Sequence, residues 1–186
     1  MKRKLTQTDI AGYMPYDLKV QDRDQDIWVL CQLGNADPCM NGDIGLTTDD
    51  GDYLQYDYLD DIKPVLRPMS DLYVEITERG YNDGEPFIPI LKLANLLGTP
   101  EVYQWELHSD GCCAFSPEAM DYFRWMNVER SFLHSPSYRD DYPGYIICDQ
   151  HEMYDLLHRL HFDYRGLIGE GLAISVNDLP TNPYEN

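Results

Sequence analysis

Short apolar runs separated by polar turns fill the first third of the chain, a pattern typical of β-strands. Residues 18–20 alternate apolar and polar side chains, and the apolar run 27–31 follows after the polar turn 22–26. Asn-Gly and Asp-Gly turns bound a further short strand at 44–47, and residues 62–66 form another apolar run. These runs predict an N-terminal antiparallel β-meander.

Beyond residue 69 the apolar residues recur three or four positions apart, as they do in amphipathic helices. Ser116-Pro117-Glu118 is the clearest helix start, and Pro89 suits the first turn of a helix that ends at Gly98. A late strand is expected at 172–176, after three closely spaced glycines. Helices are predicted at 5–12, 70–79, 89–97, 116–133 and 149–160, and the first of these is short.

These patterns together predict an α+β fold, in which an N-terminal antiparallel β-meander is followed by a mainly helical C-terminal half packed on it. A chain of 186 residues with 43% hydrophobic and 12% aromatic residues can bury a core of its own. The sequence contains neither repeats nor a low-complexity linker. We therefore predict a single domain over residues 1–179 and a loose C-terminal tail over 180–186.

Charge narrows the classes of partner. The chain carries 33 acidic and 14 basic residues, a formal net charge of −19. Residues 20–62 hold eleven aspartates and one arginine, and a second acidic block spans 101–186. A field of this sign repels nucleic acid, anionic lipid and nucleotide phosphates, and it attracts cations and basic protein surfaces. Aspartate also suits turns, so part of the first block has a local structural reason.

Motifs for several function classes are missing from the sequence. It contains neither of the phosphate-binding loops G-x-x-x-x-G-K and G-x-G-x-x-G. No window approaches 18 apolar residues, and the basic start Lys2-Arg3-Lys4 is followed by polar residues where a signal peptide would be apolar. Five cysteines without a framework spacing indicate a reducing compartment. We expect a cytoplasmic, non-enzymatic protein that needs no cofactor and binds neither nucleic acid nor membrane directly.

Tyrosines stand beside aspartates in two segments of the chain. Tyrosine offers rigid, amphipathic contact area and is enriched at protein interfaces, so an Asp/Tyr surface suits a basic protein partner. The alternative is that these tyrosines fill a half-buried face of a sheet. The predicted partner-binding residues are Asp52, Tyr53, Tyr56, Asp57, Tyr58, Asp60, Asp61, Tyr138, Asp140, Asp141 and Tyr142.

A second candidate site is a zinc cluster. His108-x3-Cys112 and Cys148-x2-His151 together could supply two nitrogen and two sulfur ligands, a set that zinc accepts. Cys113 would be left over, and free cysteine is also a common core residue. Cys112 or Cys113 with His108 or His134 has the residue types for thiol chemistry, although an acidic surrounding raises a thiol pKa and opposes it.

Two further motifs have both a chemical and a structural interpretation. Asp22-x-Asp24-x-Asp26 could bind a cation weakly, or it is a solvated turn; the EF-hand pattern fails because its sixth position is Ile27. His158-x2-His161-x-Asp163 places two histidines on one helix face, with an aspartate that could orient one of them. The structural interpretation is that histidine is favourable at a helix C-terminus.

Five segments of the chain, whose order agrees over roughly residues 5–179, together resemble one group of proteins: 5–7, 13–20, 62–72, 161–168 and 171–174. The group consists of small proteins of no established activity that are carried by phages and integrated elements of gut Bacteroidales bacteria. Residues 99–148 do not match it clearly, and His158 departs from its pattern where His161 and Asp163 fit. The resemblance implies a mobile-element origin and a bacterial cytoplasm.

Three hypotheses on function follow. The first is a phage or mobile-element accessory protein whose acidic surface binds a basic host or phage protein; one version is a nucleic-acid mimic that inhibits a defence enzyme. The second is a small zinc-binding domain or enzyme built on His108, Cys112, Cys148 and His151. The third is a minor structural component of a phage particle.

Overall fold

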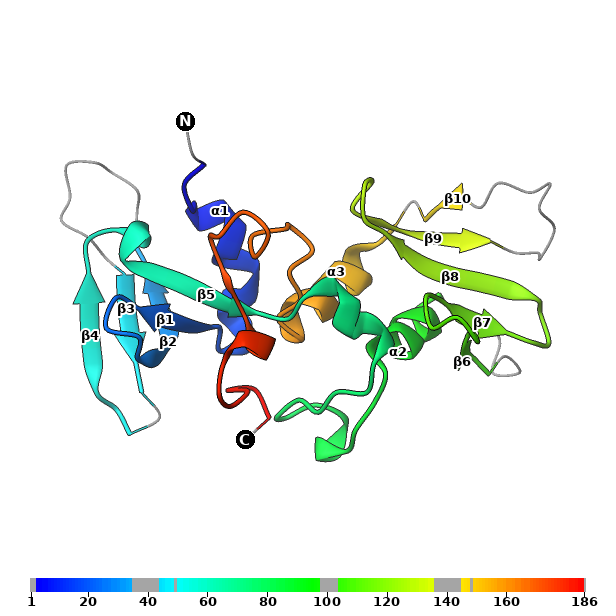
Figure 1. Cartoon of the computed structure of the whole chain (residues 1–186), viewed down its shortest axis with the longest axis horizontal. Helices are drawn as coiled ribbons and strands as arrows, with labels where there is room; N and C mark the ends of the chain where they lie inside the picture. The colour runs from blue at the N-terminus through cyan, green and yellow to red at the C-terminus, as the bar shows by residue number, and fades with distance from the viewer. Residues whose placement is uncertain are drawn as a thin grey trace. The chain divides into compact units, whose positions relative to one another are not determined.

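The chain divides into two compact units in the computed structural model (Figure 1). Unit 1 joins Met1–Pro68 to Leu157–Asn186, and unit 2 is Met69–Leu156. The single domain predicted over 1–179 stays a prediction. The structure describes residues 3–34, 44–48, 50–97, 104–135, 145–147 and 149–185.

Unit 1 is built on a six-stranded sheet in the order β11-β5-β1-β2-β3-β4. β1 to β5 pair antiparallel, which agrees with the predicted meander, and β11 lies parallel to β5. The strands predicted at 18–20, 27–31, 44–47, 62–66 and 172–176 are all present, whereas β4 is not predicted. The bounds are β1 (Lys19–Asp22), β2 (Ile27–Leu33), β3 (Ile44–Thr47), β4 (Tyr53–Tyr56), β5 (Ile62–Leu66) and β11 (Ile174–Ser175).

The core of unit 1 joins the sheet to the two ends of the chain. α1 (Gln7–Ile10) continues into the 3₁₀ helix η1 (Ala11–Tyr16), and Tyr13 on η1 is fully buried. The Tyr13 hydroxyl donates a hydrogen bond to the carbonyl oxygen of Phe162 at 2.7 Å. Apolar side chains from β1, β2 and β3 pack in the same cluster, among them Val20, Leu30 and Leu46.

Gly12 on η1 leaves room for the His158 imidazole. A Cβ atom at residue 12 would lie 2.4 Å from His158 Nε2. The ring is held by a 2.9 Å hydrogen bond to the Tyr164 hydroxyl and meets the Tyr13 ring edge-on. We expect Gly12→Ala to lower the free energy of unfolding by about 1–3 kcal/mol, measured by urea denaturation, because the ring must move.

The matched background for this prediction is His158→Ala. With the imidazole removed, Gly12→Ala should cost much less, because nothing as large faces the new methyl group. An equal loss of stability in both backgrounds would show that the clash with His158 is not the cause.

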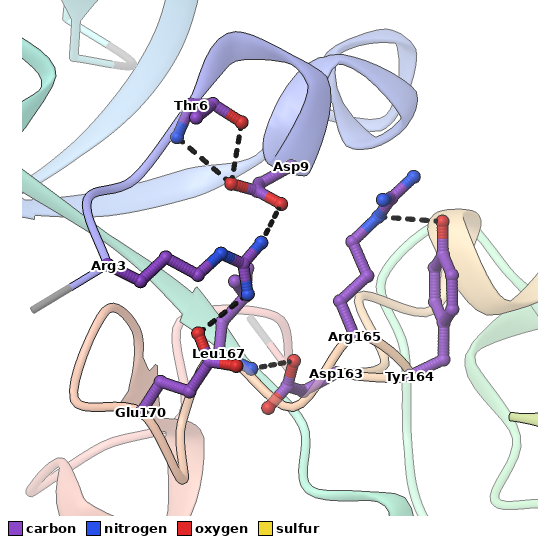
Figure 2. A network of polar contacts seen from close by, with 8 residues as sticks. All are labelled: Arg3, Thr6, Asp9, Asp163, Tyr164, Arg165, Leu167 and Glu170. Atoms are coloured by element: carbon purple, nitrogen blue, oxygen red, sulfur yellow. Dashed lines mark hydrogen bonds and ion pairs between the residues drawn. The ribbon is translucent and has the colours of Figure 1, made fainter.

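A polar network ties the N-terminal segment of unit 1 to the segment after α3 (Figure 2). The Arg3 guanidinium forms ion pairs with Asp9, which is buried, and with Glu170 at 2.6 Å. The Asp9 carboxylate also accepts hydrogen bonds from the backbone N–H and the hydroxyl of Thr6, at 3.0 and 2.7 Å. These bonds cap the first turn of α1 and neutralise a buried charge.

Tyr184 anchors residues 180–185, where the sequence predicts a loose tail. Its side chain is 4% exposed and its ring stacks on His161, with 3.8 Å between the ring centroids. The Tyr184 hydroxyl donates to the carbonyl oxygen of Val65 at 2.7 Å and accepts from the Lys19 N–H at 3.1 Å. The tail therefore contributes a side chain to unit 1.

Unit 2 contains a five-stranded antiparallel sheet in the order β10-β9-β8-β7-β6. Phe123 on β8 and Phe132 on β9 stack with 5.1 Å between ring centroids, and both are fully buried. α2 (Pro89–Asn95) contacts β7, and α3 (His151–Arg159) runs from unit 2 into unit 1. The strands are β6 (Glu106–Leu107), β7 (Ala114–Ser116), β8 (Asp121–Met126), β9 (Ser131–Ser135) and β10 (Tyr145–Ile146).

The prediction of a mainly helical C-terminal half is wrong. The residues predicted as a helix over 116–133 form the end of β7, β8 and most of β9 (Figure 1). Buried and less buried residues alternate along β8, with Phe123 and Trp125 inward, which is the two-residue period of a strand. Ser116 begins a turn and not a helix, because the backbone becomes left-handed at Met120, with a φ of 58°, and β8 starts at Asp121.

The other predicted helices have mixed outcomes. The helix predicted over 70–79 is replaced by a 3₁₀ turn and a β-bridge between Ile76 and Phe87. α2 and α3 confirm the helices at 89–97 and 149–160, although Gly98 lies outside the described residues. None of the described helices is long and apolar enough to cross a membrane. The remaining 3₁₀ turns are η2 (Leu59–Asp61), η3 (Met69–Tyr73), η4 (Asn82–Gly84) and η5 (Val176–Asp178).

Candidate functional site

Five of the predicted partner-binding residues lie exposed on β4 and on the segments directly before and after it. β4 is the outermost strand at one side of the six-stranded sheet. Tyr53 is 57% exposed and Tyr58 is 69% exposed, and the neighbouring aspartates are exposed as well. We call this surface the Asp/Tyr edge and define it as Asp52, Tyr53, Asp57, Tyr58 and Asp60.

Tyr56 and Asp61 belong to the structure beneath this surface. Tyr56 is 6% exposed, its hydroxyl donates to Asp22 at 3.2 Å, and burial raises the pKa of Tyr56. The Arg23 guanidinium lies 4.8 Å from the centre of the Tyr56 ring. A hydrogen bond with Tyr56, followed by the negative charge of Asp61, raises the pKa of Arg23. Asp61 itself is half-buried. For Tyr56, the alternative of a tyrosine that fills the face of a sheet is confirmed.

Lys4 reduces the charge of the Asp/Tyr edge at one point, because it forms an ion pair with Asp60. Exposed ion pairs contribute little to stability, so the main effect of this pair is to weaken the negative electrostatic field near Asp60. The second predicted Asp/Tyr segment, Tyr138, Asp140, Asp141 and Tyr142, lies outside the described residues, as does Cys148.

Asp22 organises the turn between β1 and β2. Its Oδ1 accepts the backbone N–H groups of Asp24 and Asp26 at 2.9 and 3.0 Å, and its Oδ2 accepts the indole N–H of Trp28 at 3.0 Å. The carboxylate is buried and its oxygens are used by these donors. The arrangement therefore supports turn formation over cation binding for this aspartate motif.

His158, His161 and Asp163 each serve a different local contact. α3 ends at Arg159 and His161 has a φ of 59°, so the two histidines do not share a helix face. His161 Nε2 lies 2.7 Å from the carbonyl oxygen of Tyr16, while His158 contacts Tyr164. The interpretation of a histidine pair on one helix face is wrong because the helix ends between them.

Asp163 holds the loop that follows α3 in unit 1. Its two carboxylate oxygens accept the backbone N–H groups of Leu167 and Ile168, each at 2.8 Å, and the residue is 6% exposed. Figure 2 shows the contact with Leu167. The apolar side chain of Leu167 is fully buried in the core. Asp163 is therefore a structural residue of this loop.

The hairpin between β6 and β7 in unit 2 brings three different metal-ligating side chains together. The His108 N–H donates to the Cys113 carbonyl oxygen at 2.9 Å, and Gly111 makes the turn with a φ of 71°. His108 Nδ1 lies 2.9 Å from Asp110 Oδ1, which also accepts the Cys112 N–H at 3.1 Å. One ligand atom each of His108, Asp110 and Cys113 lies within 4.8 Å of the other two.

Protonation in this hairpin follows from its hydrogen bonds. The Cys112 thiol and N–H, together with His108, lower the pKa of Asp110 to about 2. The same hydrogen bond from the thiol to Asp110 raises the pKa of Cys112. Burial, followed by the nearby Cys112 and Asp110, raises the pKa of Cys113 to about 12. Both thiols are thus neutral near pH 7 in the metal-free chain, which disfavours a thiolate nucleophile.

Replacing Asp110 by asparagine should make Cys112 react faster with iodoacetamide at pH 8. The carboxylate stabilises the neutral thiol, so its removal lowers the thiol pKa and raises the thiolate fraction several-fold. Peptide mapping in the presence of a chelator measures the rate at each cysteine. Cys31, which is exposed, is the internal control and should keep its rate; an unchanged rate at Cys112 would contradict the prediction.

Aromatic rings and one arginine surround the hairpin. The His108 ring meets Tyr122 and Phe115, with 5.3 and 5.9 Å between ring centroids. The positive charge of Arg124 lowers the pKa of both the Cys112 and the Cys113 thiol. This effect is smaller than the hydrogen bond to Asp110 and the burial that raise these pKa values. The site is thus half-enclosed on the imidazole side and open at Asp110, whose side chain is 56% exposed.

His151 lies elsewhere in unit 2, at a half-open cavity of about 400 Å³ near the start of α3. The backbone N–H of His151 donates to the Asp149 carboxylate at 3.2 Å. His151 is not part of the group that converges at the hairpin. The cavity is lined by Leu96, Asp149, His151, Glu152 and Met153.

Among the described residues, His108 is the predicted zinc ligand that lies in a converging group. Its two partners there, Asp110 and Cys113, are not among the ligands predicted from the sequence. An Asp-Gly turn signal at 110–111 was available to place both residues at a hairpin. Comparison of the chain with protein-family models, with curated proteins and with solved structures finds no match.

Proposed function

We propose that this chain is a non-enzymatic accessory protein of a phage or mobile element that binds a basic protein in the cytoplasm of a bacterial host. The observation that carries the proposal is the exposure of Tyr53 and Tyr58 among exposed aspartates on the Asp/Tyr edge. A partner that buries one such ring gains about 1.5–3 kcal/mol from the apolar area. The same rings give contact area at a low cost in side-chain entropy.

Charge defines the class of partner. A net charge of −19 attracts basic proteins over a distance and speeds their association. On the Asp/Tyr edge Lys4 offsets Asp60, so Asp52 and Asp57 are the natural contacts for lysine or arginine side chains. Exposed charges are screened over about 10 Å at 0.1 M salt, so binding should weaken strongly as salt rises.

A narrower form of the proposal is nucleic-acid mimicry. In this form the acidic surface occupies the nucleic-acid groove of a host enzyme, such as a defence nuclease, and competes with its substrate. Its support is the acidic field of the chain, which attracts a basic groove as the phosphates of nucleic acid do. The same field repels nucleic acid itself. Competition between the chain and a DNA or RNA duplex for the captured partner separates this form from simple binding.

Three double substitutions test the proposal, two on the Asp/Tyr edge and one as a control. The first variant, Asp52→Asn with Asp57→Asn, removes two charges from the Asp/Tyr edge, and the control, Glu118→Gln with Glu129→Gln, removes two exposed charges from unit 2. The second variant, Tyr53→Ser with Tyr58→Ser, leaves the net charge unchanged. Each is used to capture proteins from a Bacteroidales lysate, following the resemblance, at low and high salt.

We expect the wild-type chain to retain a basic protein at about 50 mM salt and to release it at about 500 mM. Both edge variants should retain at least tenfold less of it, whereas the control should match the wild-type chain. Equal capture by all four proteins, or capture that salt does not change, would contradict the proposal.

A further inference from the structure

We propose that His108, Asp110 and Cys113 bind one transition-metal ion of the zinc class, with the adjacent Cys112 as the fourth ligand. This site lies in unit 2 and is independent of the Asp/Tyr edge, which lies in unit 1. The observation that carries it is the convergence of a nitrogen, an oxygen and a sulfur ligand atom within 4.8 Å of one another.

The distances leave little to rearrange. Metal–ligand bonds of about 2.0–2.3 Å put two ligands of one tetrahedral ion about 3.3–3.8 Å apart. His108 Nδ1 and Asp110 Oδ1 are 2.9 Å apart and have to open slightly, and no pair in the group has to close by more than about 1 Å. Rotation of the exposed Asp110 side chain can supply that movement.

The hairpin fixes the ligands from the backbone. The hydrogen bond between the His108 N–H and the Cys113 carbonyl closes the β6–β7 turn, so its first and last residues face each other. Between them the Gly111 N–H donates to the His108 carbonyl at 2.7 Å. The unfolded chain lacks this arrangement, so a bound metal would also stabilise the hairpin.

The mixed donor set selects the kind of metal. Thiolate and imidazole suit zinc and cobalt, whereas calcium and magnesium require oxygen ligands. Cys112 lies outside the three converging residues, and its exposed thiol, which is hydrogen-bonded to Asp110, has to rotate toward the ion to add a second sulfur. A bound dication stabilises both thiolates, their protons pass to solvent, and Arg124 offsets the remaining negative charge.

A hydrogen-bonded turn is the competing explanation for the same contacts, and Asp110→Asn separates the two. The asparagine carbonyl can still accept the Cys112 N–H and keep the turn, but it is a poor ligand for zinc. Because residue 110 is exposed, this variant is expected to fold. Cys113 is buried, so Cys113→Ser is used only after its circular dichroism matches that of the wild-type chain.

The full chain, reduced and stripped of metal, is titrated with Co²⁺ and then with Zn²⁺. We expect about one equivalent of cobalt to bind with the visible absorption of a tetrahedral, thiolate-ligated ion, and zinc to displace it. Asp110→Asn and His108→Gln should weaken cobalt binding at least tenfold, Cys112→Ser should reduce the sulfur-to-cobalt absorption, and the control Cys31→Ser should change nothing.

Three results would each overturn the proposal. The first is the absence of tetrahedral cobalt absorption with the wild-type chain. The second is unchanged cobalt affinity in both the Asp110 and the His108 variants, which would place the ion elsewhere. The third is a preference for Mg²⁺ or Ca²⁺ over Zn²⁺ in competition, which would exclude a sulfur-containing site.

Discussion

Replacing Asp163 by alanine is expected to lower the free energy of unfolding by about 3–5 kcal/mol. The carboxylate accepts the N–H groups of Leu167 and Ile168, and a buried donor without an acceptor costs about 1–3 kcal/mol. Release of the loop would also loosen the buried side chain of Leu167. Urea denaturation followed by circular dichroism measures the change.

Two substitutions control for this prediction. Asp163→Asn keeps one oxygen acceptor and should lose about half as much stability as the alanine variant. Asp178→Ala removes an exposed aspartate of the same unit and should stay within about 0.5 kcal/mol of the wild-type chain. If Asp163→Ala were also within that range, the carboxylate would have no structural role.

Replacing Phe123 by alanine is expected to cost about 3–5 kcal/mol, because the ring is fully buried at the centre of β8. It stacks on Phe132, and its edge meets Trp105 with 6.4 Å between ring centroids. The cavity left behind would be lined by aromatic side chains of unit 2. Urea denaturation followed by tryptophan fluorescence reports mainly on this unit, since two of the three tryptophans, Trp105 and Trp125, are buried there.

Phe123→Leu and Val128→Ala are the matched controls. Leucine fills most of the space and should cost less than half of the alanine value. Val128 is 91% exposed, so its change to alanine should leave stability within about 0.5 kcal/mol. A loss below about 1 kcal/mol for Phe123→Ala would contradict the buried aromatic layer between β8 and β9.

The strands of unit 1 were predictable because local signals and burial agree there. Polar Asp-rich and Asn-Gly turns separate short apolar runs, and those runs became β1, β2, β3 and β5. β4 is missing from the predicted strands because Tyr53-Leu54-Gln55-Tyr56 is too short and too polar to stand out as an apolar run. Its alternation of exposed Tyr53 with half-buried Leu54 is itself a weak strand signal.

Unit 2 was mispredicted because a local start signal outweighed the pattern behind it. Ser-Pro-Glu at 116–118 resembles a helix N-terminus, yet serine and proline also serve turns. Asp121–Met126 is rich in aromatic residues, and Phe123-Arg124-Trp125 alternates aromatic and charged side chains, which favours a strand. In the structure, left-handed φ angles at Met120 and Arg130 close the turns at both ends of β8.

Candidate sites were only partly predictable, because a sequence does not show burial or long-range contact. The position of Tyr56 beneath the surface follows from its hydrogen bond to Asp22, 34 residues away. Asp163 was a candidate partner for histidine, but its backbone contacts make it a loop residue. His108 was predicted as a ligand, while its partners Asp110 and Cys113 depend on the geometry of the hairpin.

Site-specific photo-crosslinking tests the central claim, that a basic protein binds at the Asp/Tyr edge, most directly. A photoreactive residue is placed at Tyr58, which is 69% exposed, and at Val128 as a control of equal or greater exposure. We expect position 58 to yield an adduct with a basic protein that disappears at high salt, and position 128 to yield none. The absence of an adduct from position 58, or the same adducts from both positions, would contradict the account.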